Sequence, residues 1–542
     1  MRHGNGETPP KRQSSGFRPR SFFGYKQTPK TTTLQQPPSS ILMKLDADIL
    51  LHVVSLIGVE YTDELLALSL TCRALHTAAL PILYSEVRLP HCYSLMVFCR
   101  SVLSHPQTRG SYIRKLGVMI PACSMGSGHI LRTWQCIYKP YIGPFLPTPL
   151  PRVWHPFLPA LLSDVLRISI NLRSIFFPFL GEWLAAYPTL ASSVAMLRNV
   201  RALDICYLGD NSDDALEDDA NSPLKYLQDT LKEVSFDRSF SLSATSAIQC
   251  SHVVGLRLHS LPIDPATGLP TPINVLASMF PNILQLACDT VPQSLQDLPK
   301  TGRKQLRSGS QQAQQSGLWS KIDTLSGSIE SLYLLAIEHP VTSLRIDTGG
   351  ISITRRSNSA LRAILESSQP EQLSFSSGGR GENPYEGYTS ISSLPRLTHL
   401  YLNVRFSGFS LESWKWYLAV PIEAAAVPNL THLVIQIGDL IFHFDAASIE
   451  PLAMAIASVC SRTLQYIVFG NAAGYFICKE VTWNLDIDAD TPDKLPLSLQ
   501  PSSSPEAYTW MSPFTSGADL EITPAGMREC AKGRSMFSMA MP

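Results

Sequence analysis

Apolar residues recur along most of the chain in one short pattern: an apolar residue, two variable ones, an apolar, one variable and another apolar. The clear cases are Ile113-Leu116-Val118, Leu172-Ile175-Phe177, Val200-Leu203-Ile205, Leu231-Val234-Phe236, Val253-Leu256-Leu258, Ile283-Leu286-Cys288, Ile329-Leu332-Leu334, Val341-Leu344-Ile346, Leu397-Leu400-Leu402, Leu430-Leu433-Ile435 and Leu464-Ile467-Phe469. Alternation at the end of each pattern is typical of a strand with one buried face. Helical spacing fills the intervals at 158–169, 181–197, 273–280, 358–366 and 446–459. The pattern predicts short strands that alternate with helices.

The spacing of these patterns predicts how the strands assemble. Their last apolar positions lie 28, 31 and 22 residues apart from Phe177 to Leu258, and 29, 27, 33 and 34 apart from Ile346 to Phe469 when Phe375 is included. A strand and a helix at this period resemble the irregular leucine-rich repeats. That resemblance implies an α/β solenoid, with parallel strands in one curved sheet and helices behind it. An ordinary α/β domain with sequential strands is the alternative.

Several segments interrupt the period. The pattern at Ile329-Leu332-Leu334 ends only 12 residues before Ile346, so one of these two segments is expected in a hairpin or an extended turn. Polar composition predicts an exposed loop at 290–321, a solvated acidic loop at 210–219 and a glycine-rich loop at 376–388.

We expect four regions: a disordered basic tail (1–40), a helical module (41–90), the repeat array (91–484) and a Pro- and Ser-rich, partly ordered tail (485–542).

The segment 45–89 holds three short helical patterns before strand-like sequence begins. The first helix carries apolar residues at helical spacing, the second begins at Thr62, and the third is expected to end before Pro81. The apolar residues of the first are Ile49, Leu50, Val53, Leu56 and Ile57. Three helices this short do not bury all their leucines among themselves. They either cap the region that follows or dock on another protein.

This segment resembles an F-box of the fungal F-box-like type. The matching residues are Leu45, Ile49-Leu50, the run from Leu65 to Arg73 that reads LLALSLTCR, Ala79-Leu80-Pro81 and Leu83-Tyr84. Asp46 stands where Pro is common in that family, and Leu75 stands where Trp is frequent. The resemblance implies docking on the adaptor Skp1 through Leu45, Ile49, Leu50, Val53, Leu65, Leu68, Leu70 and Arg73. We expect Leu50, Val53, Leu65 and Leu68 to be partly exposed in the isolated chain.

Composition narrows the classes of partner and compartment. The net charge is zero, with 44 basic and 44 acidic residues, so the chain offers no general attraction to nucleic acid or membrane. No apolar run approaches the ~20 residues needed to span a bilayer, and the N-terminus has no signal-peptide core. The 11 cysteines form no CxxC pair, which is typical of reduced thiols in a cytoplasmic or nuclear protein.

No motif for nucleotide, metal or covalent chemistry is found in the sequence, so no catalytic residue, metal or cofactor is assigned. Alternation along the strands instead directs one residue in two toward the open side of the sheet. In the C-terminal repeats these residues are expected to be exposed and to add little to stability. Arg345, His399, Tyr401 and His432 are the candidate target-binding residues, with Asp347, Asn403, Val434 and Gln436 beside them.

The family resemblance implies a substrate-recognition subunit of an SCF-type E3 ubiquitin ligase. The F-box-like helices would bind a Skp1-type adaptor and, through it, a cullin ligase, and the solenoid would bind a protein target. The chain itself would catalyse nothing. Two alternatives stay open: an F-box-like scaffold that recruits nothing for degradation, and an enzyme whose site is assembled from scattered loops.

Overall fold

The computed structural model is mixed α/β and has one long, mostly parallel sheet. The described residues are 47–57, 61–90, 92–120, 157–177, 180–205, 222–236, 248–263, 271–292, 295, 298–347, 355–378, 391, 393–405, 426–438, 462–471, 476–482 and 498–501, with single residues between 450 and 460. Within these residues, fifteen strands form one sheet in strict sequence order. All neighbours from β1 to β13 are parallel, and β14 and β15 close the sheet as antiparallel strands.

The strands are short and nearly all are separated by helices or long connections. They are β1 (Glu86–Leu89), β2 (Lys115–Val118), β3 (Ser174–Phe176), β4 (Ala202–Ile205), β5 (Glu233–Phe236), β6 (Gly255–Ser260), β7 (Gln285–Thr290), β8 (Thr324–Gly327), β9 (Ser343–Asp347), β10 (Gln372–Gly378), β11 (His399–Arg405), β12 (His432–Gly438), β13 (Tyr466–Asn471), β14 (Phe476–Thr482) and β15 (Ser498–Pro501). The helices are α1 (Ala47–Ile57), α2 (Thr62–Ser69), α3 (Arg73–Leu83), α4 (Cys92–Ser104), α5 (Pro106–Tyr112), α7 (Leu158–Ile168), α8 (Leu180–Ala186), α9 (Pro188–Ala195), α10 (Pro223–Leu227), α11 (Ile273–Met279), α13 (Lys300–Gln315), α14 (Ile329–Leu335) and α15 (Arg355–Ser368).

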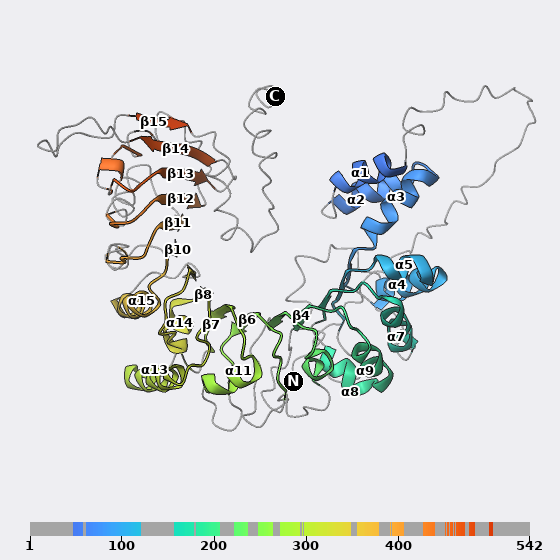
Figure 1. The fold of residues 1–542 in the computed structure, drawn as a ribbon. Helices are drawn as coiled ribbons and strands as arrows, with labels where there is room; N and C mark the ends of the chain where they lie inside the picture. Colours follow the sequence, from blue (N-terminus) through green and yellow to red (C-terminus); the bar gives the residue numbers. More distant parts are fainter. Residues whose placement is uncertain are drawn as a thin grey trace, which may run out of the picture.

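The sheet curves into an arc, and the labelled helices from α7 to α15 lie along its outer side (Figure 1). Two rows of apolar side chains run from strand to strand between the sheet and these helices. Leu203, Val234 and Leu256 are register neighbours in the first row, and each is at most 2% exposed. The predicted parallel neighbours are confirmed, because a crossover of this length returns each strand beside the one before it.

Asparagine side chains tie successive units together at the start of several strands. Asn171, Asn199, Asn282 and Asn429 each stand directly before the first apolar residue of the pattern, and each side-chain Nδ2 donates to a backbone oxygen 29 to 60 residues earlier, at 2.6–2.7 Å. These bonds satisfy carbonyl groups that face no strand partner. An Asn that precedes an apolar residue was a sequence signal for this anchor.

The three N-terminal helices form a unit with a small core of its own. Leu50 and Val54 from α1, Leu65 from α2, and Leu75 and Ala79 from α3 are all at most 4% exposed and pack together. Leu75 belongs to this core. The core is separate from the long apolar core of the sheet and its helices, and α3 leads directly toward β1.

Three sequence predictions about local structure are wrong. The third helix continues through Pro81 to Leu83, because a proline this close to the helix end costs a single backbone hydrogen bond. The segment 290–321 contains the helix α13 rather than only a loop, since Leu306, Arg307 and Ala313 pack one of its faces against the core.

The third wrong prediction placed Ile329-Leu332-Leu334 among the strand patterns, whereas this segment forms helix α14. The Ser328 hydroxyl accepts a hydrogen bond from the backbone N–H of Ser331 at 3.2 Å and so caps this helix at its N-terminus. The strand of this repeat is β8, which lies just upstream. Apolar residues at positions 1, 4 and 6 fit one helix face and one strand equally well over so short a segment.

The tail 1–40 and the loop 210–219 lie outside the described residues, as do most of the predicted loop 376–388 and most of the tail 485–542. Among the helices of the described part, none is both long and apolar enough to cross a membrane.

Candidate functional site

A second apolar stripe on α1 points away from the three-helix core. Ile49, Val53 and Leu56 are spaced four and three residues apart, which places them on one helix face, and they are 49%, 41% and 73% exposed. The core-facing stripe of α1 lies about a quarter turn away and consists of the buried Leu50 and Val54 and the partly buried Ile57. A helix that is apolar on a solvent-facing stripe is typical of a docking surface.

The second helix adds two exposed leucines four residues apart. Leu66 on α2 is 49% exposed, and Leu70, directly after the helix, is 76% exposed. Together with the α1 stripe they form what we call the docking surface: Ile49, Val53, Leu56, Leu66 and Leu70. Its leucines, isoleucine and valine carry no hydrogen-bonding group that would favour their exposure to water.

The predicted Skp1-docking residues divide between core and surface. Leu50 and Leu65 are buried in the three-helix core, so the expectation that they are partly exposed is wrong. Ile49, Val53, Leu70 and Arg73 are exposed and Leu68 is half-buried. Leu45 lies outside the described residues. Leu56 and Leu66 were not among the predicted docking residues, although their helical spacing from Val53 and Leu70 was a signal for this role.

The inner face of the sheet carries the polar residues that alternate with the apolar rows. It includes Glu86, Asp204, Glu233, Arg257, Arg345 and, toward the C-terminal end, His399, His432 and Tyr466. Arg257 is ion-paired with Asp289 across two strands, with 3.1 Å between Nη2 and Oδ2. Charges of both signs are mixed, which suits a protein partner better than nucleic acid.

Two histidines and a tyrosine stack across β11, β12 and β13. The rings of His399 and His432 are 4.3 Å apart and nearly parallel, and the rings of His432 and Tyr466 are 4.9 Å apart. The Thr398 and Thr431 hydroxyls donate to the backbone oxygens of Glu371 and Thr398, the residues directly before β10 and β11, at 3.1 and 2.9 Å. Each hydroxyl proton is thus used, so each hydroxyl accepts the Nδ1–H of the neighbouring histidine at 2.8 Å.

This stack favours neutral imidazoles. Burial lowers the pKa of His432 to about 4, and the neighbouring His399 adds to this effect, while burial also lowers the pKa of His399 against an opposing pull from Glu371. A charged ring would lose hydration and face a second ring at stacking distance.

We expect the C-terminal repeats to lose stability as the pH falls. The folded-state pKa of His432 lies below the unfolded value of 6.5, so its contribution is complete above pH 6.5 and is lost toward pH 4. After a discount for solvent screening, the loss is about 1–2 kcal/mol. Urea unfolding at pH 4 to 7.5 measures it in wild type and in His432→Phe, which keeps a stacked ring that does not titrate.

The matched control is His105→Gln, at an exposed histidine after α4. This variant should follow the wild-type pH dependence, whereas His432→Phe should lose clearly less stability on acidification. Equal pH dependence in all three proteins would contradict the role assigned to the stack.

The predicted target-binding residues are less exposed than expected at the C-terminal end. Tyr401, His399 and His432 are half-buried, and the Tyr401 hydroxyl donates to the Gln436 side chain. Val434 lies on the same face and is fully buried. The expectation that these residues are exposed is therefore wrong, because they pack and hydrogen-bond with one another. Arg345 is exposed, as expected.

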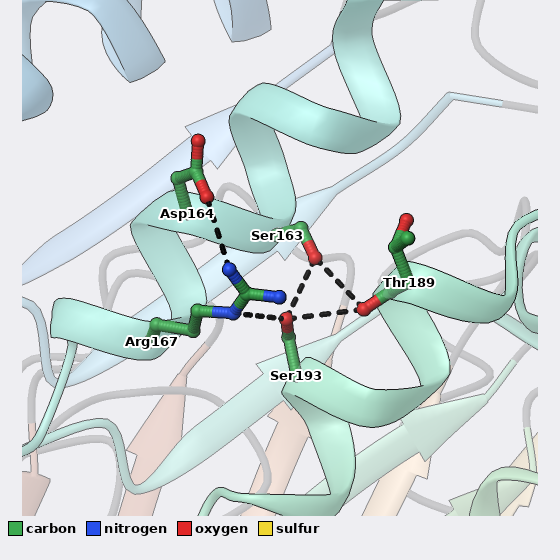
Figure 2. A network of polar contacts seen from close by, with 5 residues as sticks. All are labelled: Ser163, Asp164, Arg167, Thr189 and Ser193. Carbon is green, nitrogen blue, oxygen red and sulfur yellow. Dashed lines mark hydrogen bonds and ion pairs between the residues drawn. The ribbon is translucent and has the colours of Figure 1, made fainter.

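A polar network joins α7 to α9 (Figure 2). The Ser163 and Ser193 hydroxyls lie 2.6 Å apart, and both reach the backbone oxygen of Thr189. The Arg167 Nε donates to Ser193 Oγ at 3.2 Å, and its Nη1 is paired with Asp164 at 3.4 Å. Within the described chain no histidine or carboxylate bonds either hydroxyl, so the serines lack an activating base. The network holds the two helices together.

The described cysteines are free thiols: Cys72, Cys92, Cys99, Cys250, Cys288 and Cys460. Burial raises the pKa of Cys99, Cys250 and Cys460 to about 12, and it also raises the pKa of Cys288. Thiols this hard to ionise are poor nucleophiles. Across the described ranges, no three His, Cys, Asp or Glu side chains are grouped so that they could hold a metal ion.

Comparison with known proteins gives no family assignment. No protein-family model matches the chain, and no curated protein matches it significantly in sequence.

Proposed function

We propose that the chain is the substrate-recognition subunit of an SCF-type E3 ubiquitin ligase. The N-terminal three-helix unit would dock on a Skp1-type adaptor as an F-box-like module, and the curved sheet, as a leucine-rich-repeat-like solenoid, would bind a protein target on its inner face. The chain would contribute proximity and orientation rather than chemistry of its own.

The observation that carries this proposal is the docking surface. The three helices already close a core of five buried residues, yet the five apolar side chains of the docking surface stay outside it, as do Leu51 and Tyr61. Burial of an apolar side chain is worth ~1.5–3 kcal/mol, so covering these residues with an apolar partner would be strongly favourable. Their positions fall within the segment that resembles an F-box.

The sheet supports the second half of the proposal. Stacked parallel strands present their inner residues as one continuous concave surface, which is how solenoid proteins bind extended or globular partners. The mixed charges, the histidine–tyrosine stack and the exposed Arg345 supply the residue types that recur in protein interfaces.

Affinity purification with and without residues 41–90 tests the proposal. The full chain should recover a Skp1-type adaptor and a cullin, and the deleted chain should recover neither while still recovering the target. Recovery of the adaptor by the deleted chain would contradict docking through the three-helix unit.

A further inference from the structure

Arg345 lies at the centre of a patch of hydroxyl groups on the inner face of the sheet. In the strand register its lateral neighbours are Ser326 on β8 and Ser374 on β10. Ser343 precedes it by two residues on β9 and therefore faces the same side. Neighbouring strands lie ~4.8 Å apart, so a guanidinium and these hydroxyls are within reach of one small group.

Arg345 is an exposed cation on the inner face, without a salt bridge to any other described residue. The described chain also gives its guanidinium no hydrogen bond. Arg257, which lies on the same face, differs in this respect because it is paired with Asp289. Asp347 faces the same side two residues further along, but no ion pair joins it to Arg345.

Two of the surrounding serines are nearly buried as residues, but their hydroxyl oxygens are not among the buried unpartnered atoms and so remain accessible at the surface. Ser343 is 9% exposed and Ser374 is 5% exposed, and neither hydroxyl makes a hydrogen bond within the described part of the chain. Both groups stand beside Arg345, so a ligand that accepts hydrogen bonds there would satisfy all three.

The donors in this patch select the chemistry of the ligand. An arginine fork beside hydroxyl donors matches the oxygens of a carboxylate or a phosphate. The patch ends at Tyr401, the register neighbour of Ser374, and at His399, the register neighbour of Gln372. These rings give an oxyanion carried on a polypeptide an aromatic surface to pack against.

We propose that Arg345, with Ser326, Ser343 and Ser374, binds an oxyanion on a side chain of the protein target, a carboxylate or a phosphate. The assignment of this oxyanion to a protein target rests on the proposed function. Anion binding itself is a property of the isolated chain and is independent of adaptor docking.

The test follows the arginine Nε–Hε signals of the full chain by NMR at constant ionic strength. Inorganic phosphate, acetate and chloride are titrated separately, and the Arg345 signal is assigned by its loss in Arg345→Gln. We expect a saturable shift of this signal with phosphate or acetate and none with chloride. Ser374→Ala should weaken anion binding at least threefold without loss of the fold.

Arg257→Gln is the matched control, because Arg257 lies on the same face but is already neutralised by Asp289. This variant should leave the response of Arg345 unchanged, and the Arg257 signal in wild type should not saturate. If phosphate binds more tightly than acetate, the group that the site recognises is a phosphorylated side chain. If acetate binds more tightly, that group is a carboxylate side chain. A response that follows ionic strength alone, or that is equal at Arg257, would overturn the proposal even if adaptor docking holds.

Discussion

Replacing Leu65 by Asp will unfold the N-terminal three-helix unit, whereas the same change at its neighbour Leu66 will leave the unit folded. Leu65 is 1% exposed in the core with Leu50, Val54 and Leu75, and Leu66 is 49% exposed. An unpaired carboxylate at the buried position should cost more than ~4 kcal/mol, and at the exposed position less than ~0.5 kcal/mol.

Limited proteolysis of the full chain measures this difference at the level of the three-helix unit. The Leu65→Asp protein should be cut rapidly within 47–83, while the Leu66→Asp protein should resist as wild type does. Similar cleavage of the two variants would mean that the helix faces are assigned incorrectly.

Replacing Gly327 by Ala will destabilise the middle of the sheet. The backbone φ of Gly327 is +154°, and a Cβ there would lie 2.1 Å from the backbone oxygen of Cys288 on the neighbouring strand. Neither the strand nor the carbonyl can move without breaking the register of β7 and β8. We expect a loss of at least ~3 kcal/mol in the free energy of unfolding.

Gly309→Ala supplies the control for this variant. Gly309 lies within α13, and a Cβ there meets nothing within 4 Å. Alanine at a helix interior should raise stability by ~0.5–1 kcal/mol. Urea unfolding of both variants should therefore show shifts of opposite sign. A neutral effect of Gly327→Ala would show that the β7–β8 pairing is looser than the structure indicates.

Most strands of the sheet were predictable because their burial depends on local alternation, whereas β8, β14 and β15 were not predicted. Leu203, Leu256 and Leu433 each stand two residues before another apolar residue, and that spacing fits a strand with one buried face. The order of the strands followed from the length of the crossovers. Helix α13 escaped prediction because Arg307 fills a core-facing position: its guanidinium donates to the backbone oxygen of Tyr333 at 2.6 Å and lies over the Tyr333 ring.

The candidate docking residues were predictable only as a set. Helix α1 carries two apolar stripes, and the sequence alone does not decide whether Leu50 or Ile49 faces the core. That choice is made by the packing of α3, whose Leu75 and Ala79 meet one stripe and leave the other in solvent. The inner face shows the same limit, since Val434 has the correct strand register and is nevertheless fully buried.

The central claim is that the exposed apolar side chains of the three-helix unit bind a Skp1-type adaptor. The direct test is the dissociation constant of the purified full chain with purified adaptor, for wild type and for Leu66→Asp combined with Leu70→Asp. Both leucines lie outside the three-helix core, so the double variant should stay folded. We predict saturable binding for wild type and at least ~100-fold weaker binding for the variant. Wild type that does not bind, or a folded double variant that binds equally well, would contradict the claim.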